Sequence, residues 1–189
     1  IDRLGEVFPV LVDTLGSERV FSLYVRPSFG RTDPGFDQLL LVSPPDMHLE
    51  YAGLYRGAEG QMAGVEGVAR VPTAGDSLLL SFPLIGPAAG AELVRLDFRT
   101  ALYSTGAVLQ AALQYRAGGP GAWQRVDPGD ASPAIAGNTT TLVGAFKSES
   151  LIDEVRVEPA LFTPNGDGIN EQAVFRFKVV RVGDNSPIQ

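Results

Sequence analysis

The strongest local signal for chemistry lies near the C-terminal end, in the run Pro164-Asn165-Gly166-Asp167-Gly168-Ile169-Asn170-Glu171. Asn and Asp alternate there with Gly, so side-chain oxygens can converge while the glycines allow tight turns. Calcium loops use the same arrangement of hard oxygen ligands at alternate positions, a glycine at the turn and a later carboxylate. The candidate calcium ligands are Asn165, Asp167, the carbonyl of Ile169, and Asn170 or Glu171.

The same segment fits a second interpretation, a rigid Asx-type turn held by hydrogen bonds between side chains and the backbone. It is shorter and less acidic than a full EF-hand loop. The sequence therefore leaves two hypotheses open, a calcium site and a stiff turn between two domains. Calcium is the only cofactor that the sequence suggests.

Residues suited to catalysis are scarce. The 189 residues include no cysteine and a single histidine, His48, which excludes a thiolate nucleophile and most zinc sites. No Gly-x-Ser-x-Gly elbow accompanies His48. Acidic pairs such as Asp33 with Asp37 lie in turns rich in glycine and proline, where carboxylates are usually solvated caps. We predict that the protein is not an enzyme.

The charge balance limits the classes of partner. There are 22 acidic and 15 basic residues, and the net charge of −7 argues against a nucleic-acid binder, which would carry a basic patch. No stretch approaches the roughly 18 apolar residues that a membrane span needs. The sequence starts at Ile1 without a basic, then apolar, leader, as a mature exported chain would. We expect neither nucleic-acid binding nor membrane insertion.

The elements that must position these residues are strands. Val94, Leu96 and Phe98 alternate with polar neighbours, the period of a strand with one buried face. Roughly nine or ten short strands separated by glycine- and proline-rich turns are typical of an all-β protein. We predict an antiparallel β-sandwich, Ig-like or of the jelly-roll/cohesin-like type, without substantial helix. Similar alternation occurs in residues 20–26, 77–82, 108–115, 139–146, 154–158 and 174–181.

Two runs have predicted places within the sheets. The continuous apolar run Leu39–Val42 predicts a central strand that is covered on both faces. The run Val7–Val12 predicts a strand at an edge, because Pro9 lacks the N–H group that a central strand must donate.

A domain boundary is predicted near Pro159, where the composition changes. Residues 1–158 would form the sandwich, and residues 159–189 would hold the Asn/Asp/Gly loop and one strand. About thirty residues cannot build their own core. The strand therefore either opens a second, truncated Ig-like domain or pairs with a neighbouring subunit, through Val174, Phe175, Phe177 and Val179.

The segment Phe162–Glu171 resembles the signature Phe-Ser/Thr-Pro-Asn-Gly-Asp-Gly-x-Asn-Asp, with Glu171 in place of the last Asp. That signature opens the gliding-motility-associated C-terminal domain, a sorting signal of type IX secretion, and related Ig-like domains similar to that of the flagellar hook-capping protein. The resemblance covers about residues 159–182 and implies export and a multidomain bacterial surface protein, not an activity. The stretches Gly35–Leu39 and Trp123–Asp130 resemble cohesin-like and carbohydrate-binding-like sandwiches.

Aromatic residues suggest a further hypothesis. Trp123 follows a glycine-rich turn and, with Tyr115, could form a platform for sugar rings; the alternative is that both pack on the core.

Together these observations predict a non-catalytic structural or adhesive module of a secreted or cell-surface bacterial protein. Its partners would be other domains of the same protein. The alternatives are a subunit of an extracellular filament, assembled with identical subunits by strand exchange through the terminal strands, and a glycan-binding module.

Overall fold

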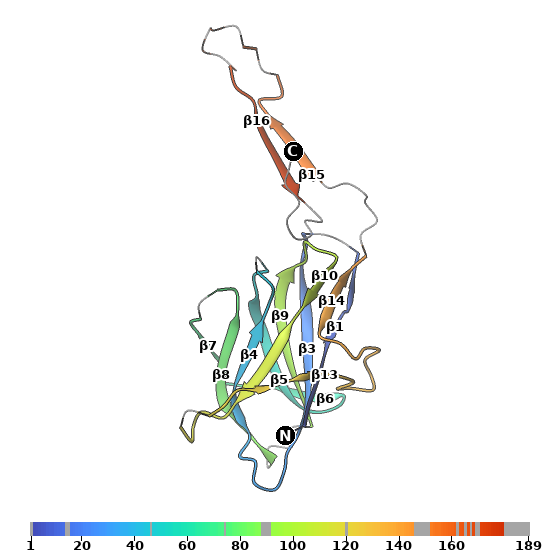
Figure 1. The fold of residues 1–189 in the computed structure, drawn as a ribbon, viewed down its shortest axis with the longest axis vertical. Helices are drawn as coiled ribbons and strands as arrows, with labels where there is room; N and C mark the ends of the chain where they lie inside the picture. Colours follow the sequence, from blue (N-terminus) through green and yellow to red (C-terminus); the bar gives the residue numbers. More distant parts are fainter. Residues whose placement is uncertain are drawn as a thin grey trace. The chain divides into compact units, whose positions relative to one another are not determined.

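A computed structural model describes residues 2–13, 16–45, 47–73, 75–87, 92–119, 121–145, 152–161, 163–164, 166, 168 and 171–179. The chain forms two compact units, Ile1–Ala145 and Phe146–Gln189. The first unit is an all-β sandwich of mainly antiparallel strands (Figure 1), which confirms the predicted fold class. Within the described residues, no helix is long and apolar enough to span a membrane.

Three sheets build the sandwich. The six-stranded sheet has the order β13 (Asp127–Pro128), β1 (Asp2–Phe8), β3 (Glu18–Ser28), β9 (Leu93–Ala101), β5 (Glu50–Ala58) and β6 (Gln61–Gly64). The five-stranded sheet has the order β12 (Gln124–Arg125), β11 (Gln110–Gln114), β4 (Phe36–Val42), β8 (Leu78–Ile85) and β7 (Ala69–Val71). The three-stranded sheet has the order β10 (Gly106–Val108), β14 (Thr141–Gly144) and β2 (Leu11–Val12).

The core follows from the alternation in the sequence. Alternate apolar residues of β3 and β9 point inward and are buried, namely Phe21, Leu23, Val25, Val94, Leu96 and Phe98. The ring of Phe21 stacks on that of Phe98 with centroids 5.9 Å apart. Strand β4 is central, between β11 and β8, as its apolar run predicts. Its Leu39 and Leu41 are buried, whereas Leu40 is half-buried, so only one face of the strand is fully covered.

Two runs that the sequence predicts as single strands each change sheets part-way. The run Val7–Val12 ends its pairing in the six-stranded sheet at Phe8 and enters the three-stranded sheet at Leu11. Pro9 has no N–H group to continue the ladder, which is the physical reason for the break. The run from Val108 likewise breaks at buried Leu109, between β10 and β11. Strands that pass from one sheet to another form the corners of a sandwich.

The second unit contains a two-stranded antiparallel ribbon, β15 (Ile152–Glu158) with β16 (Val174–Val179). The sequence predicts a boundary near Pro159, with β15 closing the sandwich, whereas the structure divides the chain after Ala145. The physical reason is that the apolar residues of β15 lie opposite those of β16, as Val157 does opposite Phe175.

Candidate functional site

A row of three polar or aromatic side chains crosses the outer face of the six-stranded sheet. Arg95 of β9 lies directly opposite Tyr24 of β3 on one side and Tyr55 of β5 on the other. Directly opposed residues of neighbouring strands project from the same face. The buried neighbours Val94 and Leu96 occupy the inner face, so the row belongs to the surface that does not form the core.

The row is held in a defined geometry. The Arg95 guanidinium lies over the Tyr55 ring, with Cζ 4.2 Å from the ring centroid, which is a cation–π contact. Its Nε forms an ion pair with Asp97 Oδ1 at 3.0 Å, but no acceptor is aligned for a hydrogen bond to that nitrogen. The Tyr55 ring lies over Gly53, where a Cβ atom would come within 2.8 Å of it. Glycine at position 53 therefore lets the ring lie flat on the sheet.

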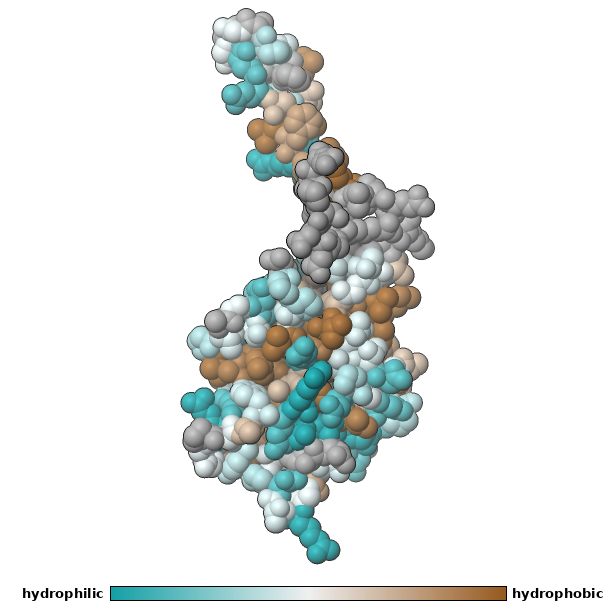
Figure 2. Space-filling view, viewed as in Figure 1, coloured by the Kyte–Doolittle hydropathy of each residue, from teal (hydrophilic) through white to brown (hydrophobic). Residues whose placement is uncertain are grey.

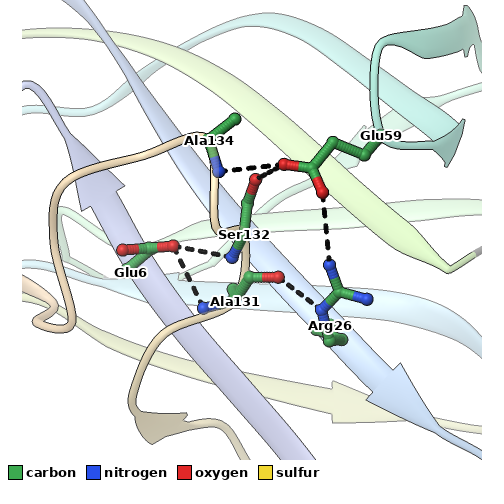
Figure 3. A network of polar contacts seen from close by, with 6 residues as sticks. All are labelled: Glu6, Arg26, Glu59, Ala131, Ser132 and Ala134. Carbon is green, nitrogen blue, oxygen red and sulfur yellow. Dashed lines mark hydrogen bonds and ion pairs between the residues drawn. The ribbon is translucent and has the colours of Figure 1, made fainter.

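The segment after β13 crosses the same face and is fastened by two carboxylates (Figure 3). Glu6 Oε1 accepts hydrogen bonds from the N–H groups of Ala131 at 3.0 Å and Ser132 at 2.8 Å. Glu59 Oε1 accepts the Ser132 hydroxyl at 2.5 Å and the Ala134 N–H at 3.0 Å. The four contacts fix the backbone of residues 131–134 against the sheet.

Arg26 completes this network. Its Nε donates to the carbonyl of Ala131 at 2.5 Å, and its guanidinium lies 4.0 Å from Glu59 Oε2, beyond hydrogen-bond distance. The second oxygen of Glu59 therefore keeps its capacity to accept a hydrogen bond. Glu6 Oε2 is also without a hydrogen-bond partner, but Glu6 is fully buried.

The three charged groups of this region differ in their protonation behaviour. Burial raises the pKa of Glu6 above its ordinary value of 4.5, against the lowering effect of the Ser132 and Ala131 N–H groups. The Ser132 hydroxyl lowers the pKa of Glu59, with a smaller opposing effect of burial. Burial acts to lower the pKa of Arg95, but Asp97 and the hydroxyls of Tyr24 and Tyr55 outweigh it and raise that pKa. Arg95 and Glu59 are accordingly charged at neutral pH.

A pocket of about 400 Å³ lies between the row of Tyr24, Arg95 and Tyr55, which we call the aromatic row, and the segment of residues 131–135, which we call the fastened segment. Buried Leu93 and the row itself line it from the sheet. The hairpin of β5 and β6 contributes Glu59 and Met62, and the fastened segment contributes Ser132 and other residues. Ligand-binding pockets are commonly of this size and combine apolar walls with a few polar groups.

Most candidate calcium ligands lie outside the residues that the structure describes. This holds for Asn165, Asp167, Ile169 and Asn170. Of the loop, Gly166 and Gly168 have φ of 80°, the left-handed conformation that glycine adopts readily. Glu171 Oε1 accepts the Gly168 N–H at 3.2 Å, which is a side chain to backbone contact of the kind that the turn hypothesis expects. Whether the loop binds calcium stays a prediction.

The predicted strand-pairing residues, Val174, Phe175, Phe177 and Val179, lie in β16, which pairs with β15 of the same chain. The register shifts between Asp153 and Arg156, where β15 has one extra residue and Glu154 has φ of 50°. This β-bulge is what places Ile152 opposite Val179.

As a result, six apolar side chains of the ribbon share one face. They are those of Ile152, Val155, Val157, Phe175, Phe177 and Val179. We call this surface the apolar ribbon face. Phe175 is 62% exposed and Val155 is 58% exposed. Figure 2 shows brown, hydrophobic surface on this unit beside teal, hydrophilic surface.

The two aromatic residues of the predicted sugar platform lie around the turn that leads to β12. Trp123 is 40% exposed. Tyr115 is half-buried, and its ring lies over Gly118, where a Cβ atom would come within 2.6 Å of it. The Tyr115 ring thus lies against its own turn, and sugar binding by Trp123 and Tyr115 stays a prediction.

The acidic pair Asp33 and Asp37, considered above for catalysis, accepts hydrogen bonds from backbone N–H groups. Asp37 accepts the N–H groups of Arg116 at 2.7 Å and Ala117 at 2.9 Å. Asp33 accepts the N–H of Gly30 at 2.7 Å. The backbone carbonyl of His48 accepts the hydroxyl of Thr100. In the described part of the chain, no group of three or more His, Cys, Asp or Glu side chains is placed to hold a metal ion.

Sequence reasoning missed the aromatic row and the carboxylate network. Glu6 lies 126 positions from Ser132, so no local pattern links them. The alternation in β3, β5 and β9 does indicate that Tyr24, Tyr55 and Arg95 each project from the outer face of their strand. Only the strand order shows that these three strands are adjacent.

No family model matches the sequence, and no curated protein matches it. Among solved structures, the chain is similar to a DUF4466 family protein from Parabacteroides merdae, with 11% identity, a TM-score of 0.42, and coverage of 82% of this chain and 48% of that one. It is similar to the N-terminal domain of the Streptococcus gordonii adhesin Sgo0707, with 13% identity, a TM-score of 0.47, and coverage of 75% and 32%.

A third similar structure is the full-length major pilin SpaD from Corynebacterium diphtheriae, with 9% identity, a TM-score of 0.42, and coverage of 67% and 33%. The chain thus spans less than half of the length of each of these three proteins. Two of these three structures are of an adhesin domain and a pilin.

Proposed function

We propose that the protein is a non-catalytic structural module of a secreted or cell-surface bacterial protein, in which the sandwich is followed by the beginning of a second β-domain. The observation that carries the proposal is the apolar ribbon face. A two-stranded ribbon alone is marginally stable in water and needs further strands or another layer against its apolar side.

The sandwich suits a structural role because several of its carboxylates accept hydrogen bonds from its own loops. Asp37 and Glu6 each hold two backbone N–H groups, and Glu59 holds one together with a hydroxyl. Such contacts satisfy backbone groups in loops that would otherwise depend on water. The bacterial and exported origin is supported by the resemblance of residues 162–171 to the signature of exported proteins.

We propose that further strands of the same polypeptide pack on the apolar ribbon face and complete an Ig-like second domain. The bulge in β15 supports this choice. The bulge places Glu154, which is not a glycine, in the unfavourable left-handed conformation. Its effect is to keep Ile152 on the same face as Val155 and Val157. Such precise alignment is expected where a face packs in a core, not where it stays in water.

The test uses the 189-residue chain and a hydrophobic dye such as ANS, which binds exposed apolar surface. We expect a monomer by light scattering, with dye binding that the double variant Phe175→Ser/Phe177→Ser removes. The matched control is Leu84→Ser, which replaces a 45% exposed apolar residue of the sandwich and should leave dye binding unchanged.

Self-association would overturn the proposal. Filaments in electron micrographs of the chain, absent in the double variant, would favour the alternative that the ribbon joins identical subunits. A monomer that binds no dye would also contradict the proposal, because the apolar ribbon face would then be covered within this chain.

A further inference from the structure

We propose that the pocket of about 400 Å³ bounded by Tyr24, Tyr55, Arg95 and Glu59 is a binding site for an uncharged sugar ring. The site lies within the sandwich and is independent of the ribbon. It also differs from the Trp123 and Tyr115 platform that the sequence suggests.

The aromatic groups point to a ligand with apolar as well as polar surface. Tyr24 and Tyr55 are half-buried and line the pocket with buried Leu93 and the half-buried Met62. Tyrosine offers an apolar ring face together with a hydroxyl that seeks a hydrogen-bond partner. A pyranose has the matching character, because its C–H groups form apolar patches and its hydroxyls surround them.

The hydrogen-bonding capacity that remains in the pocket fits hydroxyl groups. Glu59 Oε2 is an acceptor without a hydrogen bond, since Arg26 is 4.0 Å away. A sugar hydroxyl can donate a hydrogen bond to this carboxylate oxygen, which a purely apolar ligand cannot do.

The charges in and around the pocket disfavour ionic ligands. An anion would meet Glu59, and Asp97 already lies 3.0 Å from the guanidinium that would attract it. A cation would need an aromatic face, but Arg95 occupies that of Tyr55 at 4.2 Å. The opposite charges of Arg95 with Asp97 and of Arg26 with Glu59 balance, which leaves a neutral ligand as the best fit.

The wall of the pocket is formed before any ligand binds. Ser132 and Ala134 are fastened by Glu59, and Ala131 and Ser132 by Glu6 (Figure 3). A fixed wall loses little conformational entropy on binding, which favours recognition of a small ligand.

The experiment is an NMR titration of the ¹⁵N-labelled 189-residue chain with the methyl glycosides of glucose, galactose, mannose and N-acetylglucosamine, and with methyl glucuronide as a charged probe. We expect saturable shifts of the amides around the pocket with at least one neutral glycoside, at a dissociation constant in the millimolar range because the ligand is small. Methyl glucuronide should bind more weakly.

Substitutions then locate the site. Tyr55→Ala should weaken binding by about tenfold or more, because it removes one aromatic wall of the pocket and the ring that holds the Arg95 guanidinium in place. Met62→Arg should do the same from the edge strand β6, by placing a long cationic side chain at the pocket while the aromatic row stays intact. The matched control Trp123→Ala should leave the affinity unchanged.

Three results would overturn the proposal. They are the absence of saturable shifts with every neutral glycoside, tighter binding of methyl glucuronide than of any neutral glycoside, and binding that Trp123→Ala removes while Tyr55→Ala and Met62→Arg leave it intact. Because the unsubstituted chain reports the location of the shifts by itself, the test stands even where one variant fails to fold.

Discussion

The sandwich and the ribbon are built from strands with the same alternation, yet their apolar faces have different surroundings. In β9 of the sandwich, Leu96 and Phe98 are fully buried. In β16 of the ribbon, Phe175 is 62% exposed and Phe177 is 47% exposed. Period-two alternation therefore determines which side of a strand is apolar, but not what covers it.

The polar faces differ as well. In the sandwich, Glu6 and Glu59 fasten a distant segment through hydrogen bonds. In the ribbon, exposed Arg156 lies directly opposite exposed Arg176. Like charges at directly opposed positions destabilise a pair of strands. The ribbon thus gains nothing from this pair and depends on its apolar ribbon face for stability.

The largest expected effect comes from truncating one phenylalanine in each region. Phe98→Ala should lower the free energy of unfolding of the sandwich by about 3–5 kcal/mol, because it leaves a cavity beside Phe21. Phe177→Ala in the ribbon should lower the free energy of unfolding measured in the same way by less than about 0.5 kcal/mol, since the Phe177 side chain is already exposed. Urea unfolding followed by Trp123 fluorescence measures both. Equal losses in the two variants would contradict the comparison.

A pH series of Glu6→Gln should show that the buried carboxyl affects the sandwich. Because burial raises its pKa, Glu6 binds its proton more tightly in the folded protein than in the unfolded chain. This stabilisation is complete below pH 4.5, the ordinary pKa, and is lost as the pH rises through the folded-state pKa. The variant cannot ionise, so its stability relative to the unsubstituted protein should improve as the pH rises from acid to neutral.

Urea midpoints across that pH range measure the effect. The control Glu50→Gln removes one negative charge at a 53% exposed side chain of the same sheet. Should the relative stability of Glu6→Gln instead decline with rising pH, the ionised form of Glu6 would be the stabilising one, and the assigned direction would be wrong.

A smaller effect is expected from changing the opposed arginines. Arg176→Glu turns a like-charge pair into an opposite-charge pair and should stabilise the ribbon by about 0.2–1 kcal/mol. Hydrogen exchange of the β15 and β16 amides should slow accordingly, while the amides of β3 keep their rates. Unchanged exchange in the ribbon would mean that these side chains do not interact across it.

The smallest effect concerns calcium at the loop before β16. Because Glu171 already accepts the Gly168 N–H, we expect the stiff turn, with the same ribbon exchange rates in calcium and in chelator. A bound ion must stabilise the state that binds it. Slower exchange in calcium that Glu171→Gln abolishes would establish the metal site and reject the turn.

The sequence was sufficient for features that depend on local pattern. The inward phase of Val94, Leu96 and Phe98 and the central place of β4 are confirmed. It was insufficient where long-range contacts decide. The pairing of β15 with β16 in place of the sandwich, and the contact of Glu6 with a segment 126 positions away, depend on tertiary packing that no local period encodes.

Amide hydrogen exchange of the whole chain tests the central claim most directly, that the sandwich is stable by itself and the ribbon is not. Protection follows the free energy of local opening. We predict that the amides of β3 and β9 exchange at the rate set by global unfolding, while those of β15 and β16 exchange at least about a thousandfold faster, a difference of about 4 kcal/mol. Equal protection in the ribbon and in β9 would contradict the account.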